Sequence, residues 1–334
     1  MPIISKREDV LRVYENAAKH GWVIPCLCTE NLTTTEAILC AASEFGRDHG
    51  IDHVPVTLAI TNQYSHRSQS VNYSHTKHWK TGLELFKADA KVLMREEKAF
   101  ENVDLMLHLD HMQYDTDAEL ADSDLSDYAT VMYDASGAPL EENIKLTRAF
   151  VEKKGAEVVI EGACDEIVDA GGASHNDITT PEKCDDYMTR TGVDLVVANL
   201  GTEHRASGKD LQYHDDAARA IKEKIGPRIV LHGTSSVTNE QVKNLFSDGV
   251  CKVNIWTALE RDSSPEVVDF LVRNASKAAG PEKVQELVKD GYLTEKCATG
   301  EKENLSAFTT VARQQIVFDK MKQMIREYLE MWYV

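Results

Sequence analysis

Short apolar runs rich in β-branched residues alternate along this chain with segments in which apolar residues recur at helical spacing. The first pattern is typical of buried parallel strands and the second of amphipathic helices. We expect eight strands, at residues 22–28, 53–60, 103–110, 129–134, 157–161, 193–200, 228–232 and 250–256. The helices expected between them span residues 33–45, 82–100, 139–154, 180–191, 215–225 and 238–248, and residues 265–334 are mostly helical.

This alternation predicts an α/β protein, a (β/α)₈ TIM barrel with a helical C-terminal extension. The chain has 334 residues and no Gly/Ser-rich or Pro-rich linker, so we expect one domain, with the barrel at about residues 10–260 and the helical tail at about 261–334. A doubly wound open sheet also fits the alternation. It would not naturally bring the ends of the third, fifth, sixth and seventh strands to one point.

Side chains that bind metals follow several of the apolar runs. In the third run, His108 and Asp110 share a face because alternate residues of a strand do, whereas His111 would face the other side unless the strand had already ended. Three further runs end in a residue of the same kind, namely Glu161, His204 and His232. In a barrel, the C-terminal ends of the strands gather at the active site, so we expect these residues to meet.

The net charge and the cysteine content limit the classes of binding partner and the cellular compartment that we expect. The formal net charge of −18 disfavours nucleic acid and anionic membrane surfaces. The seven cysteines include no Cys-x-x-Cys pair, and we interpret them as reduced thiols of a cytoplasmic protein. The chain shows no signal-peptide pattern, and no apolar run approaches the ~18 residues of a membrane span.

Six groups of residues occur in a fixed order: His108-Leu109-Asp110-His111, Tyr133-Asp134 with Pro139-Leu140-Glu141-Glu142-Asn143, Thr191-Gly192-Val193-Asp194, Gly201-Thr202-Glu203-His204, His232-Gly233-Thr234-Ser235 and Lys252-Val253-Asn254. In this combination the chain resembles, over roughly residues 10 to 260, the class II, metal-dependent ketose-bisphosphate aldolases, which include fructose- and tagatose-bisphosphate aldolases. The resemblance implies a lyase of carbohydrate metabolism that cleaves or forms a C–C bond in a phosphorylated ketose, with a dihydroxyacetone-phosphate-like donor and an aldehyde acceptor. It also implies a homodimer or homotetramer.

The resemblance assigns roles to individual residues. A catalytic zinc would be held by His111, His204 and His232, whose neutral imidazoles leave an open coordination position. Glu161 matches a glutamate near an alternate metal position, and the resemblance is compatible with a second divalent or monovalent cation. Asp110 would carry the proton of the hydroxyl that becomes the aldehyde, and Asn254 would contact the enediolate, whose charge a Lewis acid stabilises.

Phosphate binding is expected at the loops after the last two strands, a frequent anion site in barrels. These loops contain small residues whose backbone N–H groups can converge on a phosphate, namely Gly233, Thr234, Ser235 and Thr257. We also include Asn31, Thr61, Gly201 and Asn254 in the substrate-binding set. Arg205 stands where the family usually has glycine, so either it adds a bidentate anion contact or the head group differs.

Two loops depart from the family pattern. After the fifth strand the family carries a glutamate that moves the proton on the donor carbon, and here Glu166 and Asp169 are both candidates. The polar stretch Asn62–Lys80 is rich in Ser, His, Tyr and Asn and is either an active-site loop or a surface excursion. These departures favour an unusual substrate, such as a singly phosphorylated or otherwise acidic sugar.

Three other functions fit parts of the sequence. A metal-dependent hydrolase would typically have an early His-x-His pair, and the nearest such spacing here is His108 with Asp110. A Schiff-base aldolase would use a strand lysine, for which Lys252 is the candidate. A non-enzymatic barrel would leave the histidines at the strand ends without a purpose.

Overall fold

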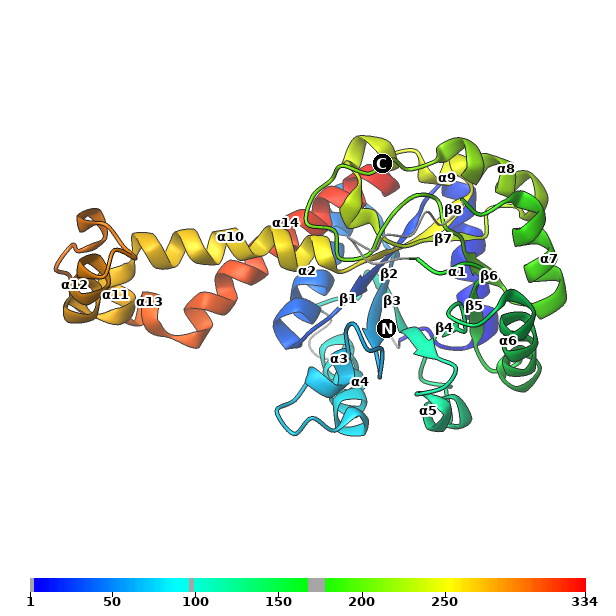
Figure 1. Cartoon of the computed structure of the whole chain (residues 1–334), viewed down its shortest axis with the longest axis horizontal. Helices are drawn as coiled ribbons and strands as arrows, with labels where there is room; N and C mark the ends of the chain where they lie inside the picture. Colours follow the sequence, from blue (N-terminus) through cyan, green and yellow to red (C-terminus); the bar gives the residue numbers. More distant parts are fainter. Residues whose placement is uncertain (1–2, 96–98, 168–177) are drawn as a thin grey trace.

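The computed structural model describes residues 3–95, 99–167 and 178–334. Eight parallel strands close into a barrel in the order β1 to β8, and helices surround it (Figure 1), so the predicted TIM barrel is confirmed. The strands are β1 (Ile24–Cys28), β2 (Val54–Thr61), β3 (Val103–Gln113), β4 (Thr130–Asp134), β5 (Val159–Ala163), β6 (Leu195–Val197), β7 (Ile229–Leu231) and β8 (Val250–Ile255).

The helices that follow the strands cover the outside of the barrel. They are α2 (Leu32–His49), α3 (Gln69–Asn72), α4 (Trp79–Arg95), α5 (Ala118–Asp122), α6 (Leu140–Lys154), α7 (Pro181–Thr191), α8 (Asp215–Ile225) and α9 (Leu245–Asp248). The first helix, α1 (Arg7–His20), precedes the barrel and was missing from the prediction. Its buried Val10 and Ala17 pack with Ile24 and Met106 inside the barrel, so α1 closes the N-terminal end of the barrel.

Some predicted elements differ in extent from those in the structure. The strand expected at residues 193–200 pairs only over Leu195–Val197, because the chain then turns and the Asn199 side chain accepts a hydrogen bond from the Gly201 N–H. The helix expected at residues 238–248 is a 3₁₀ turn (Asn239–Val242) followed by the short helix α9. The polar stretch 62–80 contains α3 and the first two residues of α4.

The barrel interior changes in character along its axis. Near α1 it is filled by apolar side chains, including Met106 and Val159. Further along lies a fully buried polar group of His108, Glu161 and Lys252. Its net cost of burial is limited because the Lys252 ammonium donates to Glu161 at 2.6 Å and to His108 Nε2 at 3.2 Å.

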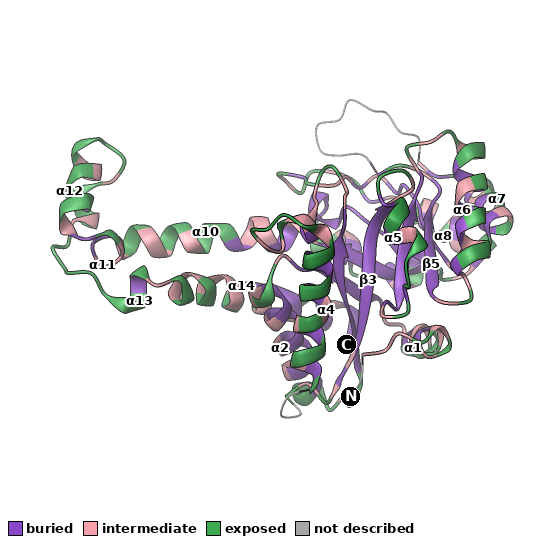
Figure 2. Cartoon of the chain, turned by 90° about the horizontal axis from the view of Figure 1, so that it is seen from below, coloured by how far each residue is buried: buried purple, intermediate pink, exposed green. Residues whose placement is uncertain are grey.

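The tail after β8 is helical, as predicted. Helix α10 (Thr257–Arg273) leaves the barrel, and α11 (Ala275–Ala279), α12 (Pro281–Lys289) and α13 (Leu305–Phe308) lie at its far end before α14 (Thr310–Tyr333) returns (Figures 1 and 2). The returning helix is anchored on the barrel, where Trp332 Nε1 donates to Val242 O and the Tyr333 hydroxyl donates to Pro55 O. No helix in the described part of the chain is long and apolar enough to cross a membrane.

Candidate active site

Three polar side chains of the third strand point to the centre of the barrel, because the strand departs from the regular alternation of side-chain directions. His108 and Asp110 point inward, as a regular strand requires. The pairing with β4 then shifts register between Leu109 and Met112, and His111 adopts a left-handed backbone conformation with φ of 49°. The strand therefore continues to Gln113 while the imidazole of His111 turns toward the same centre as Asp110, a typical effect of a bulge.

Three histidines from different strand ends meet above this bulge. His204 comes from the loop after β6 and His232 directly follows β7, and one nitrogen of each lies within 4.8 Å of the others and of one from His111. The His111 ring is nearly perpendicular to the other two, with ring centroids 5.1 Å and 5.0 Å away. Such a convergence of imidazole nitrogens has the composition of a catalytic zinc site with three protein ligands.

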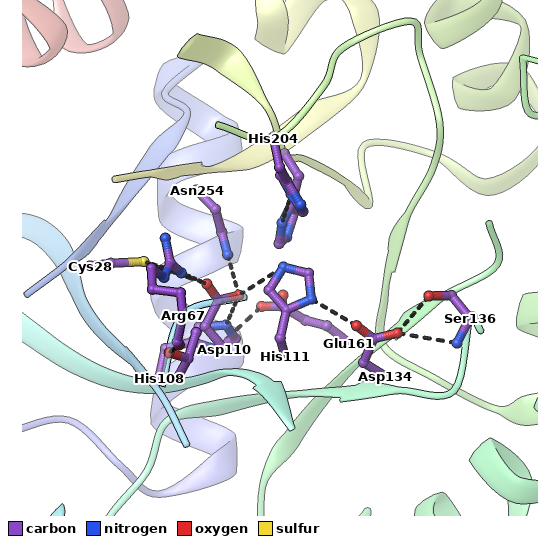
Figure 3. A network of polar contacts seen from close by, with 12 residues as sticks. Cys28, Arg67, His108, Asp110, His111, Asp134, Ser136, Glu161, His204 and Asn254 are labelled. Atoms are coloured by element: carbon purple, nitrogen blue, oxygen red, sulfur yellow. Dashed lines mark hydrogen bonds and ion pairs between the residues drawn. The ribbon is translucent and has the colours of Figure 1, made fainter. Parts of the chain in front are cut away.

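Hydrogen bonds and burial set the charge of these imidazoles. Burial lowers the pKa of His204 to about 3 and holds the pKa of His232 well below its ordinary value, so both are neutral, the form that binds metals. Burial acts in the same direction on His111, but Asp110 and the hydrogen bond to Asp134 outweigh it and raise the pKa. His111 Nδ1 lies 2.7 Å from Asp134 Oδ2 (Figure 3).

Asp110 is held from several sides. Arg67 Nη2 donates to Oδ2 at 2.9 Å, and Asn254 Nδ2 donates to Oδ1 at 2.9 Å (Figure 3). The thiol of Cys28 also donates to Oδ2, at 3.4 Å. Burial disfavours the charged form of this carboxyl, but its partners, first among them His111, hold its pKa well below the ordinary value. Asp110 is therefore an anion beside the histidines.

A pocket opens above the histidines and Asp110. Its lining includes Asn254 of β8 and residues that follow β7 and β8, namely Gly233, Thr234, Ser235, Trp256 and Thr257. In the described part of the chain, five buried polar atoms of the pocket residues have no hydrogen-bond partner: Arg67 Nε, His232 Nε2, Ser235 Oγ, Asn254 Oδ1 and Trp256 Nε1. Buried polar groups are rarely left unpaired, so this concentration indicates a place for a polar ligand.

The pocket is cationic although the whole protein is strongly acidic. Among the described residues that line it, Arg67 and Arg205 are the two arginines and Asp110 is the one carboxylate. Arg205 adopts a left-handed conformation with φ of 54°, and its Nη2 lies 3.1 Å from His66 Nδ1. Because a non-glycine residue rarely adopts this conformation, the local fold of this loop is one that glycine would also suit.

The structure brings most, but not all, of the predicted site residues together. His111, His204, His232, Asp110, Asn254, Arg205 and the residues of the last two loops line one pocket. Glu161 was expected near a metal, but it lies in the buried polar group with Lys252 and outside the histidine cluster. Its position inside strand β5, rather than at the strand end, explains the difference.

The other predicted residues outside the pocket support its surroundings. Asn31 is exposed and caps α2, where its side chain accepts from the Thr34 N–H. Thr61 is buried, and its hydroxyl donates to Arg67 O. Gly201 forms a turn with φ of 86°, where a side chain would collide with Gln212 O. Glu166 is exposed and does not line the pocket in the described part of the chain, and Asp169 lies outside the described residues.

Some pocket residues had no assigned role in the sequence analysis. Tyr64, His66 and Arg67 come from the polar stretch after β2, and Arg67 lies over the Trp256 ring with its guanidinium carbon 4.4 Å from the ring centroid. The Tyr64 ring stacks on His111, with centroids 4.4 Å apart. The absence of apolar periodicity and the density of His and Tyr marked this stretch as a candidate loop, but they did not single out Arg67.

Comparison with known proteins agrees with this geometry. The family model of class II fructose-bisphosphate aldolase matches residues 8–331. The chain belongs to the class II fructose-bisphosphate aldolase family. The predicted family is thereby confirmed, and the protein is an aldolase, an enzyme of the aldehyde-lyase type.

Relatives of this aldolase are distant in sequence but match it over most of their length. A D-tagatose-1,6-bisphosphate aldolase subunit GatY from Klebsiella oxytoca is 27% identical over 283 residues, which cover 82% of this chain and 88% of the relative. A fructose-bisphosphate aldolase from Staphylococcus aureus strain Mu50 is 27% identical over 304 residues, with 86% and 96% covered. These two relatives carry different sugar names, so similarity alone does not select the substrate.

Solved structures share the fold of the aldolase. A fructose-bisphosphate aldolase from Campylobacter jejuni superimposes with a TM-score of 0.70 at 19% identity, covering 99% of this chain and 95% of the other. The YdjI aldolase from Escherichia coli K12 superimposes with a TM-score of 0.64 at 18% identity, covering 96% of both chains. At this identity the likeness extends to the barrel and its helical extension, not to the substrate.

Proposed function

We propose that this aldolase is zinc-dependent and cleaves or forms a C–C bond in a phosphorylated ketose, with a dihydroxyacetone-phosphate-like donor and an aldehyde acceptor. The observation that carries the proposal is the position of Asp110. This carboxylate lies beside three converging imidazoles, and all four side chains face one cationic pocket. A metal-dependent aldol cleavage uses this combination of a Lewis acid and an adjacent proton carrier.

The residues present suit a zinc ion. His111, His204 and His232 would hold it, and the buried His232 Nε2 has no partner among the described residues. His111 keeps its Nε2 for a ligand because its Nδ1 pairs with Asp134, a carboxylate–histidine arrangement common around zinc. When bound, the metal would supply charge stabilisation for the enediolate that forms when the C–C bond breaks.

Asp110 and Asn254 would act on the two parts of the substrate. During cleavage, Asp110 would take the proton from the hydroxyl whose carbon becomes the aldehyde carbon, and in condensation it would return that proton. The Asn254 amide donates to Asp110 Oδ1, while its own Oδ1 is buried without a partner in the described part of the chain. That free oxygen would accept a hydrogen bond from a hydroxyl of the enediolate.

The donor phosphate would lie at the loops after β7 and β8. Gly233 has φ of 70°, and a side chain there would approach the Glu203 backbone to 2.8 Å, so glycine is required at this turn. Beside it, the buried Ser235 hydroxyl has no partner among the described residues and can donate to an anion. Arg205 would add a charged contact at the same pocket.

A Schiff-base mechanism would require a neutral lysine in reach of the substrate. Lys252 is fully buried beneath the pocket. Burial disfavours its ammonium form, but Cys26 and Glu161 outweigh this effect and raise the pKa to about 12. Lys252 is therefore protonated at neutral pH, and we assign it a structural role in the barrel interior.

Metal analysis combined with a substrate screen tests the proposal. The purified protein should contain zinc, a chelator should abolish the release of a triose from phosphorylated ketoses, and added zinc or cobalt should restore it. Borohydride with substrate should leave no adduct on Lys252, with the Lys252→Met variant as a control for non-specific labelling. Full activity in the metal-free protein, or a substrate trapped on Lys252, would refute the proposed metal mechanism.

The helical extension supports a proposal about assembly. Helices α10 to α14 extend from the barrel and expose apolar side chains, including Val268 at 57% and Val311 at 70% exposure. We propose that this extension joins two copies into a homodimer, alone or within a homotetramer. Light scattering of wild type and of the Val268→Asp, Val311→Asp double variant tests this, and a monomeric wild type would refute it.

A further inference from the structure

Arg67 has a position that the proposed reaction does not explain. It comes from the polar stretch after β2 and extends over the pocket floor to Asp110, the proposed proton carrier. Hydrogen bonds hold the backbone on both sides of Arg67 in place. The Thr61 hydroxyl donates to Arg67 O, the Thr61 N–H donates to Gln69 Oε1 at 2.9 Å, and the Asn62 amide donates to Asp117 at 2.8 Å. The guanidinium is therefore placed by the fold.

The contacts of Arg67 use only part of its binding capacity. Its Nη2 contacts Asp110 Oδ2 at 2.9 Å and Cys28 Sγ at 3.4 Å. Its Nε is buried without a hydrogen-bond partner in the described part of the chain. A guanidinium presents five donors in a planar fork that fits two oxygens of one carboxylate or phosphate, and here it lies against the Trp256 ring.

The same contact engages an oxygen that the reaction needs. Asp110 has Oδ2 bound to Arg67 and Cys28, and Oδ1 bound to Asn254. A substrate hydroxyl must reach one of these oxygens before it can give up its proton. A group that takes over the Nη2 donor of Arg67 would open a place for a hydroxyl at Oδ2. Only an anion can replace Asp110 as the partner of this largely buried guanidinium without leaving its charge uncompensated.

We propose that Arg67 determines substrate specificity by binding an anionic group, a carboxylate or a phosphate, on the aldehyde half of the substrate. This inference rests on the proposed function and deepens it. The aldehyde half follows from geometry, because Arg67 contacts Asp110, the residue proposed to receive the hydroxyl proton of that half, whereas the donor phosphate belongs at the β7 and β8 loops. When the anion binds, Arg67 gives up its ion pair with Asp110 and forms one with the substrate. Asp110 Oδ2 can then accept the substrate hydroxyl.

The test compares aldehydes in the condensation direction with dihydroxyacetone phosphate as donor. Zinc-loaded wild type and Arg67→Gln are assayed with neutral glyceraldehyde, with glyceraldehyde 3-phosphate and with succinic semialdehyde, which carries a carboxylate. We expect the ratio of kcat/KM for a charged aldehyde over glyceraldehyde to fall roughly 10- to 100-fold in Arg67→Gln. The value for glyceraldehyde itself serves as the reference, because Arg67→Gln also removes a contact of Asp110 and thereby changes condensation with every aldehyde alike.

The two charged aldehydes separate the two kinds of anion. A loss confined to succinic semialdehyde assigns a carboxylate, and a loss confined to glyceraldehyde 3-phosphate assigns a phosphate. Arg67→Lys keeps the charge without the fork and should retain part of the selectivity. Arg148→Gln, on the exposed face of α6, is the matched control and should leave every ratio unchanged.

A second readout separates this inference from the proposed function. Exchange of the donor's C–H protons with D₂O, followed by NMR without any aldehyde, should persist in Arg67→Gln where condensation with a charged aldehyde is lost. If the variant loses exchange and all condensations equally, Arg67 has a structural role and the inference is overturned. An unchanged ratio of kcat/KM for charged aldehydes over glyceraldehyde would also overturn it. Absence of exchange and of condensation in the wild type would refute the proposed function itself, and this inference with it.

Discussion

His111 and Asp134 are 23 positions apart in the chain, yet His111 Nδ1 lies 2.7 Å from Asp134 Oδ2. The two residues come from neighbouring strands β3 and β4, and the bulge in β3 turns the imidazole toward the carboxylate. Asp134 is itself fixed, because Oδ1 accepts from the Ser136 hydroxyl at 2.6 Å and Oδ2 accepts from Gln113 Nε2 at 3.1 Å. This contact determines which nitrogen of His111 faces the pocket.

The first prediction follows from that contact. Asp134→Ala should weaken zinc binding about 10- to 100-fold, the usual effect of removing a carboxylate that orients a histidine ligand. The dissociation constant is measured by competition with a chromophoric chelator. Asp122→Ala, which removes an exposed carboxylate on α5, is the control and should bind zinc like the wild type. Equal affinities in all three proteins would show that Asp134 does not orient a metal ligand.

The second prediction concerns the charge of Asp110. Asp110→Asn keeps the shape of the side chain and removes the proton acceptor, so C–C cleavage should fall by about 10²-fold or more while zinc content is retained. Metal content by atomic emission and cleavage rate are measured on the same preparation. If the variant instead lacks zinc and melts far below the wild type, then Asp110 stabilises the site rather than moving a proton.

The barrel and many of the pocket residues could be predicted from the sequence, and the reason is physical. Apolar β-branched runs are the signature of buried parallel strands, and a closed barrel gathers their C-terminal ends at one site. Residues that directly follow a strand, such as His232, could therefore be placed in advance. The position of His111 could not be derived from alternation, because a bulge with φ of 49° overrides the two-residue period.

Residues within strands and within long loops were harder to place. Glu161 has the residue type of a metal ligand, but whether it faces the pocket or the deeper interior depends on its height along the barrel axis. Arg67 is one of several polar residues in a loop without periodicity, and its contact with Asp110 joins parts of the chain 43 positions apart. Local patterns carry little information about such long-range contacts.

The third prediction concerns stability against pH. Burial, and then the nearby Glu30, raise the pKa of Glu260 on α10 to about 7, against the opposing effect of Arg67. The folded state thus holds this proton more tightly than the unfolded state, whose carboxyl has a pKa of about 4.5. The resulting contribution to stability is complete below about pH 4.5 and is lost as the pH rises through about 7.

Glu260→Gln should therefore raise the free energy of unfolding at pH 8 by about 1 kcal/mol, after allowance for partial exposure, and change it little at pH 5. Thermal denaturation of variant and wild type at both pH values measures the difference, which should be about 2 °C or more in Tm at pH 8. Glu266→Gln, at a more exposed position of the same helix, provides the comparison. A stabilisation that is equal at both pH values would contradict the raised pKa.

The fourth prediction concerns Arg205. If its guanidinium binds an anionic group of the substrate, Arg205→Gly should weaken binding of that substrate by roughly 1–3 kcal/mol, the scale of a charged hydrogen bond. The preference should shift toward ordinary ketose bisphosphates, and zinc content should not change. Because Arg205 has φ of 54°, glycine also relieves backbone strain, so the variant should be as stable as the wild type or about 1 kcal/mol more stable.

In Arg205→Gly, substrate binding should weaken while stability stays the same or rises, and this difference distinguishes a lost substrate contact from a folding defect. A variant damaged in folding would lose stability and activity together, whereas loss of a substrate contact raises KM in a protein that melts no lower. KM and kcat on a panel of singly and doubly phosphorylated ketoses, with Tm measured alongside, separate the two outcomes. Unchanged parameters across the panel would mean that Arg205 does not bind the substrate and serves contacts within the protein, such as the one with His66, 3.1 Å away. Residues of the stretch 62–80, in which Arg67 contacts Asp110, would then be the ones that make the substrate differ from an ordinary ketose bisphosphate.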